Sequence, residues 1–136
     1  MPTVQGTHGN IVNYEVLGIA EAIQKLASIG QQVKDGIDAG TLKAANGVQE
    51  EVKESIAGNR SEPKSVDTGN FLNSIQLIKI ADGMYEVSTR VEYAKILEYG
   101  GIGREPRSHF RNTQARMQEK VKETVTLAVK EAVERT

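Results

Sequence analysis

Residues 91–110 read VEYAKILEYGGIGREPRSHF and join two patterns, a strand-like alternation before them and a long helical periodicity after them. The stretch begins as a strand end, makes one or two helical turns at Tyr93–Tyr99, and opens into a loop rich in glycine and arginine. Pro106 closes the loop, because proline is accepted at the start of a helix but not inside it. Its aromatic, glycine and arginine residues are dense for this chain, and they are not arranged as an active site.

The segment before this stretch predicts a β-hairpin over residues 71–91. Phe71–Ile80 has strand-forming residues but imperfect alternation, which indicates either a bulge or two partly covered faces. Asp82-Gly83 is a strong tight-turn signal. The second strand alternates cleanly, with apolar or β-branched side chains on one face at Tyr85, Val87, Thr89 and Val91.

Helical periodicity occupies both flanks of the hairpin. Residues 15–57 predict two helices separated near Gly30, with apolar positions recurring at steps of three and four from Val16 onward. Three glycines weaken the second helix, so it should gain stability by packing closely against the sheet or against another subunit, the sheet being preferred. Residues 111–136 predict a C-terminal helix, with Ser108 as its candidate N-cap.

The remaining segments are polar. Residues 1–14 predict a mobile arm or edge strand, and residues 58–70 an exposed loop. Residues 1–136 therefore predict a single α+β domain, in which a small antiparallel sheet with a hairpin packs against a long N-terminal helix and a C-terminal helix.

Composition removes several classes of function. The 17 basic and 18 acidic residues nearly cancel, which argues against a strongly basic nucleic-acid surface. The chain has no cysteine, and its two histidines have no metal-ligand spacing, so neither a metal nor another cofactor is expected. The sequence has no apolar run long enough for a membrane span and no signal peptide, which favours a soluble intracellular protein.

Both a catalytic function and nucleic-acid binding would depend on the arginine-rich loop. His109 between Arg107 and Arg111 suggests phosphate binding, but a loop histidine near a helix start is the preferred reading. No catalytic residue is predicted, and a hydrolase would have to depend on Glu98 or His109. A local basic patch could contact DNA, pair with a neighbouring subunit or simply be solvated; its members are Arg60, Lys64, Arg104, Arg107 and Arg111.

Three motifs in a fixed order resemble the tail-completion, or head–tail joining, proteins of long-tailed phages, the lambdoid minor tail component family. The first motif is represented by Thr68, Gly69, Leu72, Ser74 and Ile75. The second is represented by Tyr93, Ala94, Ile96, Leu97, Glu98, Tyr99 and Gly100, and the third by Pro106, Arg107, Phe110 and Arg111. The resemblance runs from about Leu17 to the C-terminus, with Phe71 and the loop 101–105 departing from the family pattern.

The resemblance implies a structural virion protein, made in the bacterial host cytoplasm, that forms a homo-oligomeric ring at the head–tail junction, with six-fold symmetry or a multiple of it. Its implied partners are a head-side connector, tail-tube or tail-terminator proteins, and DNA that passes through without sequence-specific binding. The candidate subunit interface is Tyr93, Glu98, Tyr99, Gly100, Arg104 and Arg107, with Glu98 pairing with Arg104 and Arg107. Ile96 and Phe110 are expected in the core. The alternative is a small nucleic-acid-binding module that uses loop 104–111.

Overall fold

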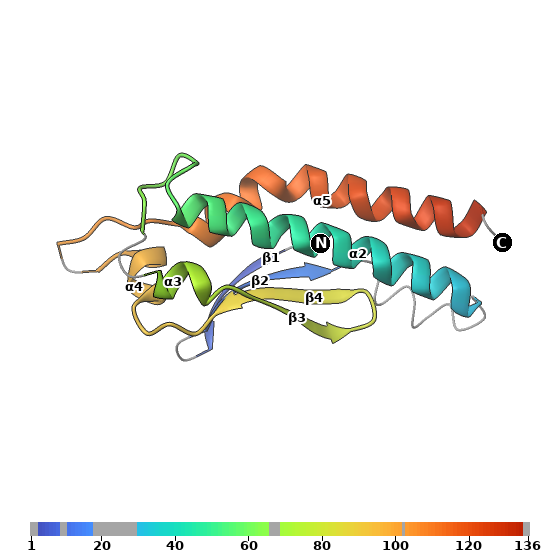
Figure 1. The fold of residues 1–136 in the computed structure, drawn as a ribbon, viewed down its shortest axis with the longest axis horizontal. Coiled ribbons are helices and arrows are strands. Elements are labelled where there is room, and N and C mark those ends of the chain that lie inside the picture. The colour runs from blue at the N-terminus through green and yellow to red at the C-terminus, as the bar shows by residue number, and fades with distance from the viewer. Residues whose placement is uncertain (1–2, 9–10, 18–29, 66–68, 102, 135–136) are drawn as a thin grey trace.

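A computed structural model describes residues 3–8, 11–17, 30–65, 69–101 and 103–134, without the side chains of residues 3–8, 11 and 17. The fold is α+β: two long helices lie side by side over one face of an antiparallel sheet (Figure 1). In chain order the elements are β1 (Thr3–His8), β2 (Ile11–Leu17), α2 (Gln31–Ile56), α3 (Asn70–Asn73), β3 (Gln76–Ala81), β4 (Met84–Thr89), α4 (Ala94–Tyr99) and α5 (His109–Glu134). The expected combination of a hairpin-containing antiparallel sheet, a long helix and a C-terminal helix is confirmed.

The sheet has the order β1-β2-β4-β3, so β2 and β4 are its interior strands. Val12, Tyr14 and Val16 on β2 are fully buried, and they stand opposite Thr89, Val87 and Tyr85 of β4. Strand β1 lies at the sheet edge, which is one of the two expectations for residues 1–14, whereas β2 continues to Leu17, so the helix expected from Glu15 does not begin there. The rest of that expected first helix, residues 18–29, lies outside the described residues. The residues from Val12 to Val16 also alternate with a period of two, and burial of that face against the helices decides for a strand.

Helices α2 and α5 pack against each other closely enough to explain the glycines of α2. A Cβ on Gly40 would overlap the Cβ of Ala128, and one on Gly36 would lie 3.0 Å from the Cβ of Ala132. The close neighbour is thus α5 of the same chain. Helix α2 also packs against the sheet, as expected, but the residues nearest these two glycines are on α5.

The hairpin of β3 and β4 is confirmed, and its Asp82-Gly83 turn has Gly83 in the left-handed region at φ 74°. The expected bulge is present between Lys79 and Ala81. The first strand begins later than expected, because Asn70–Asn73 form the short helix α3. Apolar Phe71 and Ile75 are both buried, four residues apart, a spacing that fits one face of a helix as well as one face of a strand.

One helix boundary and the burial of one loop residue also differ from expectation. Helix α5 begins at His109 and not at Arg111. Within the loop expected to be exposed, Glu62 is buried. No helix in the described ranges combines the length and apolar character needed to cross a bilayer.

Candidate interaction surface

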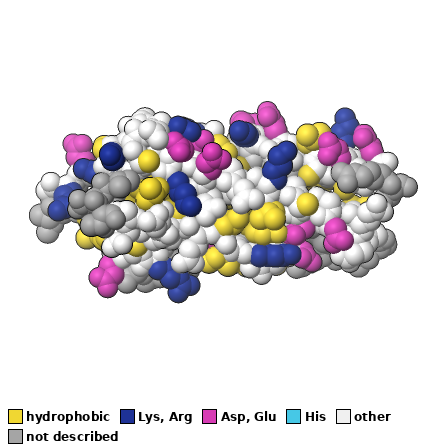
Figure 2. All heavy atoms as spheres, viewed as in Figure 1, with side chains coloured by type: hydrophobic (Ala, Val, Ile, Leu, Met, Phe, Trp, Pro, Cys, Tyr) yellow, Lys and Arg dark blue, Asp and Glu magenta, His cyan; other side chains and the backbone are white. Residues whose placement is uncertain are grey.

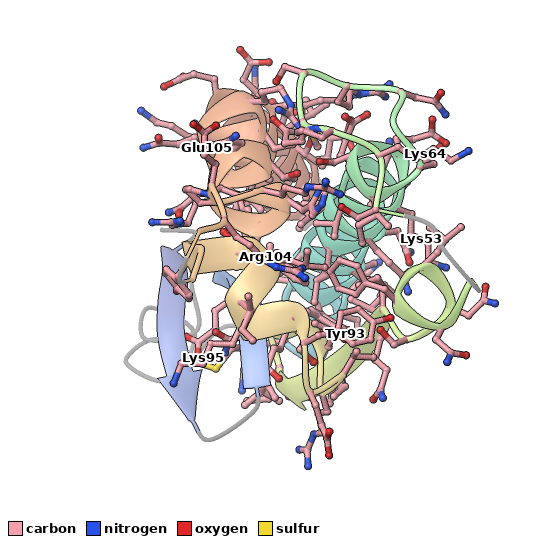
Figure 3. All side chains as sticks on the ribbon, turned by 90° about the vertical axis from the view of Figure 1, so that its left-hand side faces the viewer. Lys53, Lys64, Tyr93, Lys95, Arg104 and Glu105 are labelled. Carbon is pink, nitrogen blue, oxygen red and sulfur yellow. The ribbon has the colours of Figure 1, made fainter. Side chains whose placement is uncertain are left out.

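The most exposed aromatic and apolar side chains of the 91–110 stretch lie on one short helix at one end of the molecule (Figures 1 and 3). Tyr93, Ile96 and Tyr99 occur at steps of three residues along α4 and its start, and their exposed fractions are 43%, 47% and 36%. Tyr93 and Tyr99 are thus partly exposed, and their place in a subunit interface stays a prediction, whereas the exposure of Ile96 corrects the expectation that it belongs to the core. Ile96 is exposed because the buried face of the six-residue helix is supplied by Ala94 and Glu98.

A groove of about 410 Å³ lies beside α4. It is lined by Pro63, Ile96, Leu97, Gly103, Arg104, Glu105, Pro106 and Arg107. Two prolines and the Ile96 side chain give it apolar walls, and Arg104 and Arg107 place two cations there against the one carboxylate of Glu105. The groove is therefore amphipathic, with a net positive lining.

Glycine is required at position 100 by both conformation and space. Gly100 has φ 82°, and a Cβ there would approach the carbonyl oxygen of Arg104 to 3.0 Å and Cδ of Pro106 to 3.2 Å. The loop then closes on itself through two main-chain hydrogen bonds between Gly101 and Arg104, at 3.3 and 3.0 Å. These bonds fix where Arg104, which is exposed, leaves the backbone.

Glu98 is a buried helix cap. Its carboxylate accepts hydrogen bonds from the main-chain N–H groups of Phe110 and Arg111, each at 2.9 Å, at the start of α5. The Arg111 guanidinium adds an ion pair at 3.1 Å. The Glu98 side chain is only 2% exposed, and burial raises the pKa of its carboxyl against the lowering effect of these donors.

The capping role corrects one expectation about a local partner. Within its own chain Glu98 pairs with Arg111, and the pairs with Arg104 and Arg107 between subunits stay a prediction. Ser108 donates its hydroxyl proton to the carbonyl oxygen of Glu98, 2.9 Å away, so the cap expected from Ser108 is supplied by Glu98. The sequence contained no indication of this cap, because Glu98 lies 12 residues before Phe110 and reaches the start of the helix only after the loop has folded back.

Arg107 joins the α4–α5 loop to the loop after α2. Its guanidinium donates to the carbonyl oxygen of Lys64 at 2.9 Å and to Oγ of Ser65 at 3.4 Å. Its main-chain N–H donates to the carbonyl oxygen of Leu97 at 2.5 Å. Arg107 is thus part of the framework of this end as well as of the groove wall.

A second buried polar network lies behind the groove. Ser55 donates to the Glu62 carboxylate at 2.5 Å, and its Oγ lies 2.7 Å from Nδ1 of His109. Nε2 of His109 lies 2.8 Å from Oγ of Ser65. Because the Ser55 proton goes to Glu62, Nδ1 of His109 carries the proton and donates to Ser55, while Nε2 accepts from Ser65.

Burial, aided by two nearby arginines, keeps the histidine of this network neutral. Burial lowers the pKa of His109 to about 4, with Arg107 and Arg116 adding to the effect and Glu62 opposing it. Glu62 accepts two hydrogen bonds from Arg116, at 2.8 and 2.9 Å, and further ones from Ser61 and Asn112. These donors outweigh desolvation and hold the pKa of the Glu62 carboxyl well below its usual range.

Ser55, His109 and Glu62 do not form a catalytic triad. In a triad the serine proton goes to the histidine and the carboxylate orients the far ring nitrogen, whereas here the serine donates directly to the carboxylate. All three side chains are buried, which leaves no access for a substrate. Nothing in the sequence indicated Ser55 or Glu62, since both lie in polar contexts that are typical of a helix end and a loop.

Two members of the proposed basic patch, Arg60 and Arg111, are paired with carboxylates of their own chain. Arg60 pairs with Glu51 at 2.8 Å, and Arg111 pairs with Glu98 and stacks over the Tyr99 ring at 4.4 Å. On the face in Figure 2, basic and acidic side chains are interspersed. This arrangement gives little support to a nucleic-acid module, which needs a continuous basic surface.

The motif residues have structural positions where the structure describes them. Thr68 lies outside the described residues, whereas Gly69 is at φ 85° before α3 and turns the chain sharply, as expected, although into a helix. Oγ of Ser74 lies 2.6 Å from Oγ1 of Thr89, and Ile75 is buried. Pro106 lines the groove, and Phe110 is in the core, as expected. No cluster of His, Asp or Glu in the described ranges could hold a metal ion.

This end of the molecule has the features of a contact surface, and a family comparison gives the class of protein. A family model described as "Bacteriophage HK97-gp10, putative tail-component" matches residues 20–100, which is more than half of the chain. The chain belongs to this HK97-gp10-like family of structural phage tail components, and it is not an enzyme. No curated protein and no solved structure matches it.

The matched range includes the first two sequence motifs and ends at Gly100. The third motif, with Pro106 and Phe110, and the whole of α5 lie beyond it. The loop that carries Arg104 and the groove wall is thus outside the part that the family model covers.

Proposed function

We propose that this tail component forms a ring at the head–tail junction, where it joins the tail tube to the head and lines the DNA path. The observation that carries the proposal is the exposed α4 surface, because aromatic side chains with a polar tip are enriched where proteins meet one another. A surface at one end of the subunit suits head-to-tail contacts, and such contacts close into rings when the rotation between copies permits.

The family membership supports association with other virion proteins. In this proposal the ring contacts a head-side connector on one side and tail-tube or tail-terminator proteins on the other. Six-fold symmetry, or a multiple of it, would match the resemblance to head–tail joining proteins. DNA passes through the opening without sequence-specific contacts, and the ring is assembled in the bacterial host before it becomes part of the virion.

The test is the mass of the purified chain by light scattering over a wide concentration range, combined with electron microscopy. We expect ring-shaped particles whose abundance rises with concentration. Replacing Ile96 by Lys should reduce them strongly without lowering the melting temperature, because this side chain is exposed. The matched control is Leu127→Lys on α5, where an equally exposed leucine should be replaceable without effect. A ring population unchanged by Ile96→Lys would exclude the α4 surface from assembly.

A strictly monomeric chain that binds DNA would support the alternative nucleic-acid module instead. Such binding should weaken steeply between 50 and 200 mM salt if lysines and arginines contact phosphates. The near balance of 17 basic and 18 acidic residues, together with the mixed charges on the face in Figure 2, leads us to expect no such binding.

A further inference from the structure

Two exposed features lie at opposite ends of the β3–β4 hairpin. Strand β4 runs from the Asp82-Gly83 turn to Thr89, and α4 begins after four intervening residues. Six strand residues span about 20 Å, so the turn and α4 are separated by roughly that length. Figure 1 shows the same arrangement, with the turn and α4 at opposite ends of the sheet.

The hairpin tip carries one exposed apolar and one exposed acidic side chain. Ile80 is 51% exposed and lies within the bulge, where strand pairing is interrupted. The side chain of Asp82 is 64% exposed. Lys79 lies 3.0 Å from Asp82 and 3.2 Å from Asp38, so two carboxylates share one ammonium group and the tip has a net negative charge.

The tip is held rigidly from within its own chain. Asp38 of α2 accepts hydrogen bonds from the main-chain N–H of Gly83 at 2.7 Å and from the Tyr85 hydroxyl at 2.9 Å. These donors and Lys79 lower the pKa of Asp38 against the effect of its burial, so the anchoring carboxylate is ionised at neutral pH. A turn fixed in this way loses little conformational entropy on binding.

The groove beside α4 has the complementary character. Ile96 forms part of its apolar wall, and Arg104 is exposed at its edge. Among the described residues Arg104 forms no ion pair, whereas the arginines at 60, 111 and 116 each form at least one. The loop is held by the Gly101–Arg104 main-chain hydrogen bonds, so this site is preformed as well.

We propose that the hairpin tip of one copy docks into the α4 groove of the next copy, with Ile80 against Ile96 and Asp82 against Arg104. This inference rests on the proposed ring, for which it supplies the subunit contact. The two surfaces are different and lie at opposite ends, so each copy offers a free tip on one side and a free groove on the other. That is a heterologous contact, the type that generates rings. Charge complementarity sets the register between the two surfaces.

Disulfide crosslinking tests the contact directly, because the chain has no cysteine of its own. Under mild oxidation, Ile80→Cys and Ile96→Cys should each stay uncrosslinked alone and give a covalent dimer when mixed. The double variant should give a ladder of covalent oligomers. Ile80→Cys mixed with Leu127→Cys, an exposed site on α5, should give none. Disulfides form only when the two Cα atoms come within about 7 Å, so a product specific to the first mixture locates the contact.

Charge exchange provides an independent measurement. Asp82→Arg and Arg104→Asp should each lower the association constant at least tenfold, and the double variant should recover most of the loss. Melting temperatures should stay within a few degrees of the parent chain, which separates loss of assembly from loss of fold.

The outcomes for contact and ring are distinguishable. Rings without the specific crosslink would overturn the tip-to-groove contact and leave the proposed function standing. The crosslink and charge rescue without rings would support the contact and count against ring closure. Absence of both crosslink and particles at every concentration would overturn both.

Discussion

Glu98 illustrates how a single buried carboxylate can organise a functional end. Glu98 lies on α4 and accepts hydrogen bonds from two main-chain N–H groups at the start of α5, so it connects the exposed short helix to the long C-terminal helix. Its place in a Tyr-rich motif suggested an interface residue. Because its side chain is buried, Glu98 holds α4 in place beneath the exposed surface.

Replacing Glu98 by Ala should destabilise the fold because two N–H groups and the Arg111 guanidinium lose their acceptor. We expect the free energy of unfolding to fall by about 2–4 kcal/mol, in the range of a lost cap combined with a broken buried pair. Urea unfolding followed by circular dichroism measures it. Glu105→Ala, an exposed carboxylate of the same loop, should change stability by less than about 0.5 kcal/mol. Equal midpoints for the two variants would contradict the capping role.

His109 should make the fold sensitive to mild acid. Its folded-state pKa is about 4, below the value near 6.5 of an unfolded chain, so the unfolded state binds the proton first as the pH falls. The stability contributed by the neutral ring is therefore complete above about pH 6.5 and is lost progressively down to about pH 4. The loss should be on the order of 3 kcal/mol at most.

Unfolding experiments at pH 7, 6 and 5 measure this slope before the carboxylates begin to titrate. His109→Gln should flatten it, whereas His8→Asn, which removes the only other histidine, should preserve it. A further loss should follow below about pH 4.5 in both, because the lowered pKa of Glu62 means that its stabilising contribution is present above the unfolded value and disappears as the carboxylate is protonated. A slope unaffected by His109→Gln would assign it to another group.

At the scale of elements, the α2–α5 pair depends on glycines that differ in what surrounds them. The Cβ missing at Gly40 leaves room for Ala128, whereas a Cβ at Gly47 would meet only the Met117 methyl group, at an ordinary 3.6 Å. Both glycines weaken the isolated helix equally, so their difference comes from packing alone.

Gly40→Ala should therefore be destabilising, by about 1–3 kcal/mol, since the helices would have to separate. Gly47→Ala should be stabilising, by up to about 1 kcal/mol, through helix propensity. Thermal unfolding of the two variants provides the comparison, and adding Ala128→Gly to Gly40→Ala should restore much of the lost stability. A destabilised Gly47→Ala variant, or a Gly40→Ala variant with parental stability, would contradict this packing.

Elements with one dominant period were predictable, and those with two competing periods were not. The buried positions of α2 and α5 recur at steps of three and four over 26 residues each, which no strand imitates. Val12–Val16 and Phe71–Ile75 satisfy both a strand and a helix over a few residues. Residues 12–16 form a strand because they pair with β4 beneath the helices. Residues 71–73 of the second segment instead lie in the helical turn α3.

At the scale of the whole molecule, the N-terminal hairpin is an integral part of the sheet. Strand β1 pairs with β2 from Thr3 opposite Glu15 to His8 opposite Ile11, and β2 in turn pairs with β4. Removing β1 would leave a central strand with an unpaired edge.

Deletion of residues 1–10 should accordingly lower the melting temperature by roughly 5 °C or more, as expected for a loss of one to two kcal/mol in a chain of this size. Differential scanning calorimetry measures the change. Deleting only Met1 and Pro2, which precede β1, serves as the control and should have little effect. An unchanged melting temperature for the longer deletion would show that β1 contributes nothing to the core.

The sequence by itself determined the α+β class, the two long helices, the Asp82-Gly83 hairpin and membership of a phage tail family. These follow from local periodicity, turn chemistry and ordered motifs, which are written along the chain. Only the tertiary structure decided that β2 is central, that Glu98 is buried and that Ile96 is exposed. The pairing of Arg107 with the 58–65 loop was decided there as well. Each of these depends on contacts between residues distant in sequence, because burial and hydrogen-bond partners are set by how the elements meet.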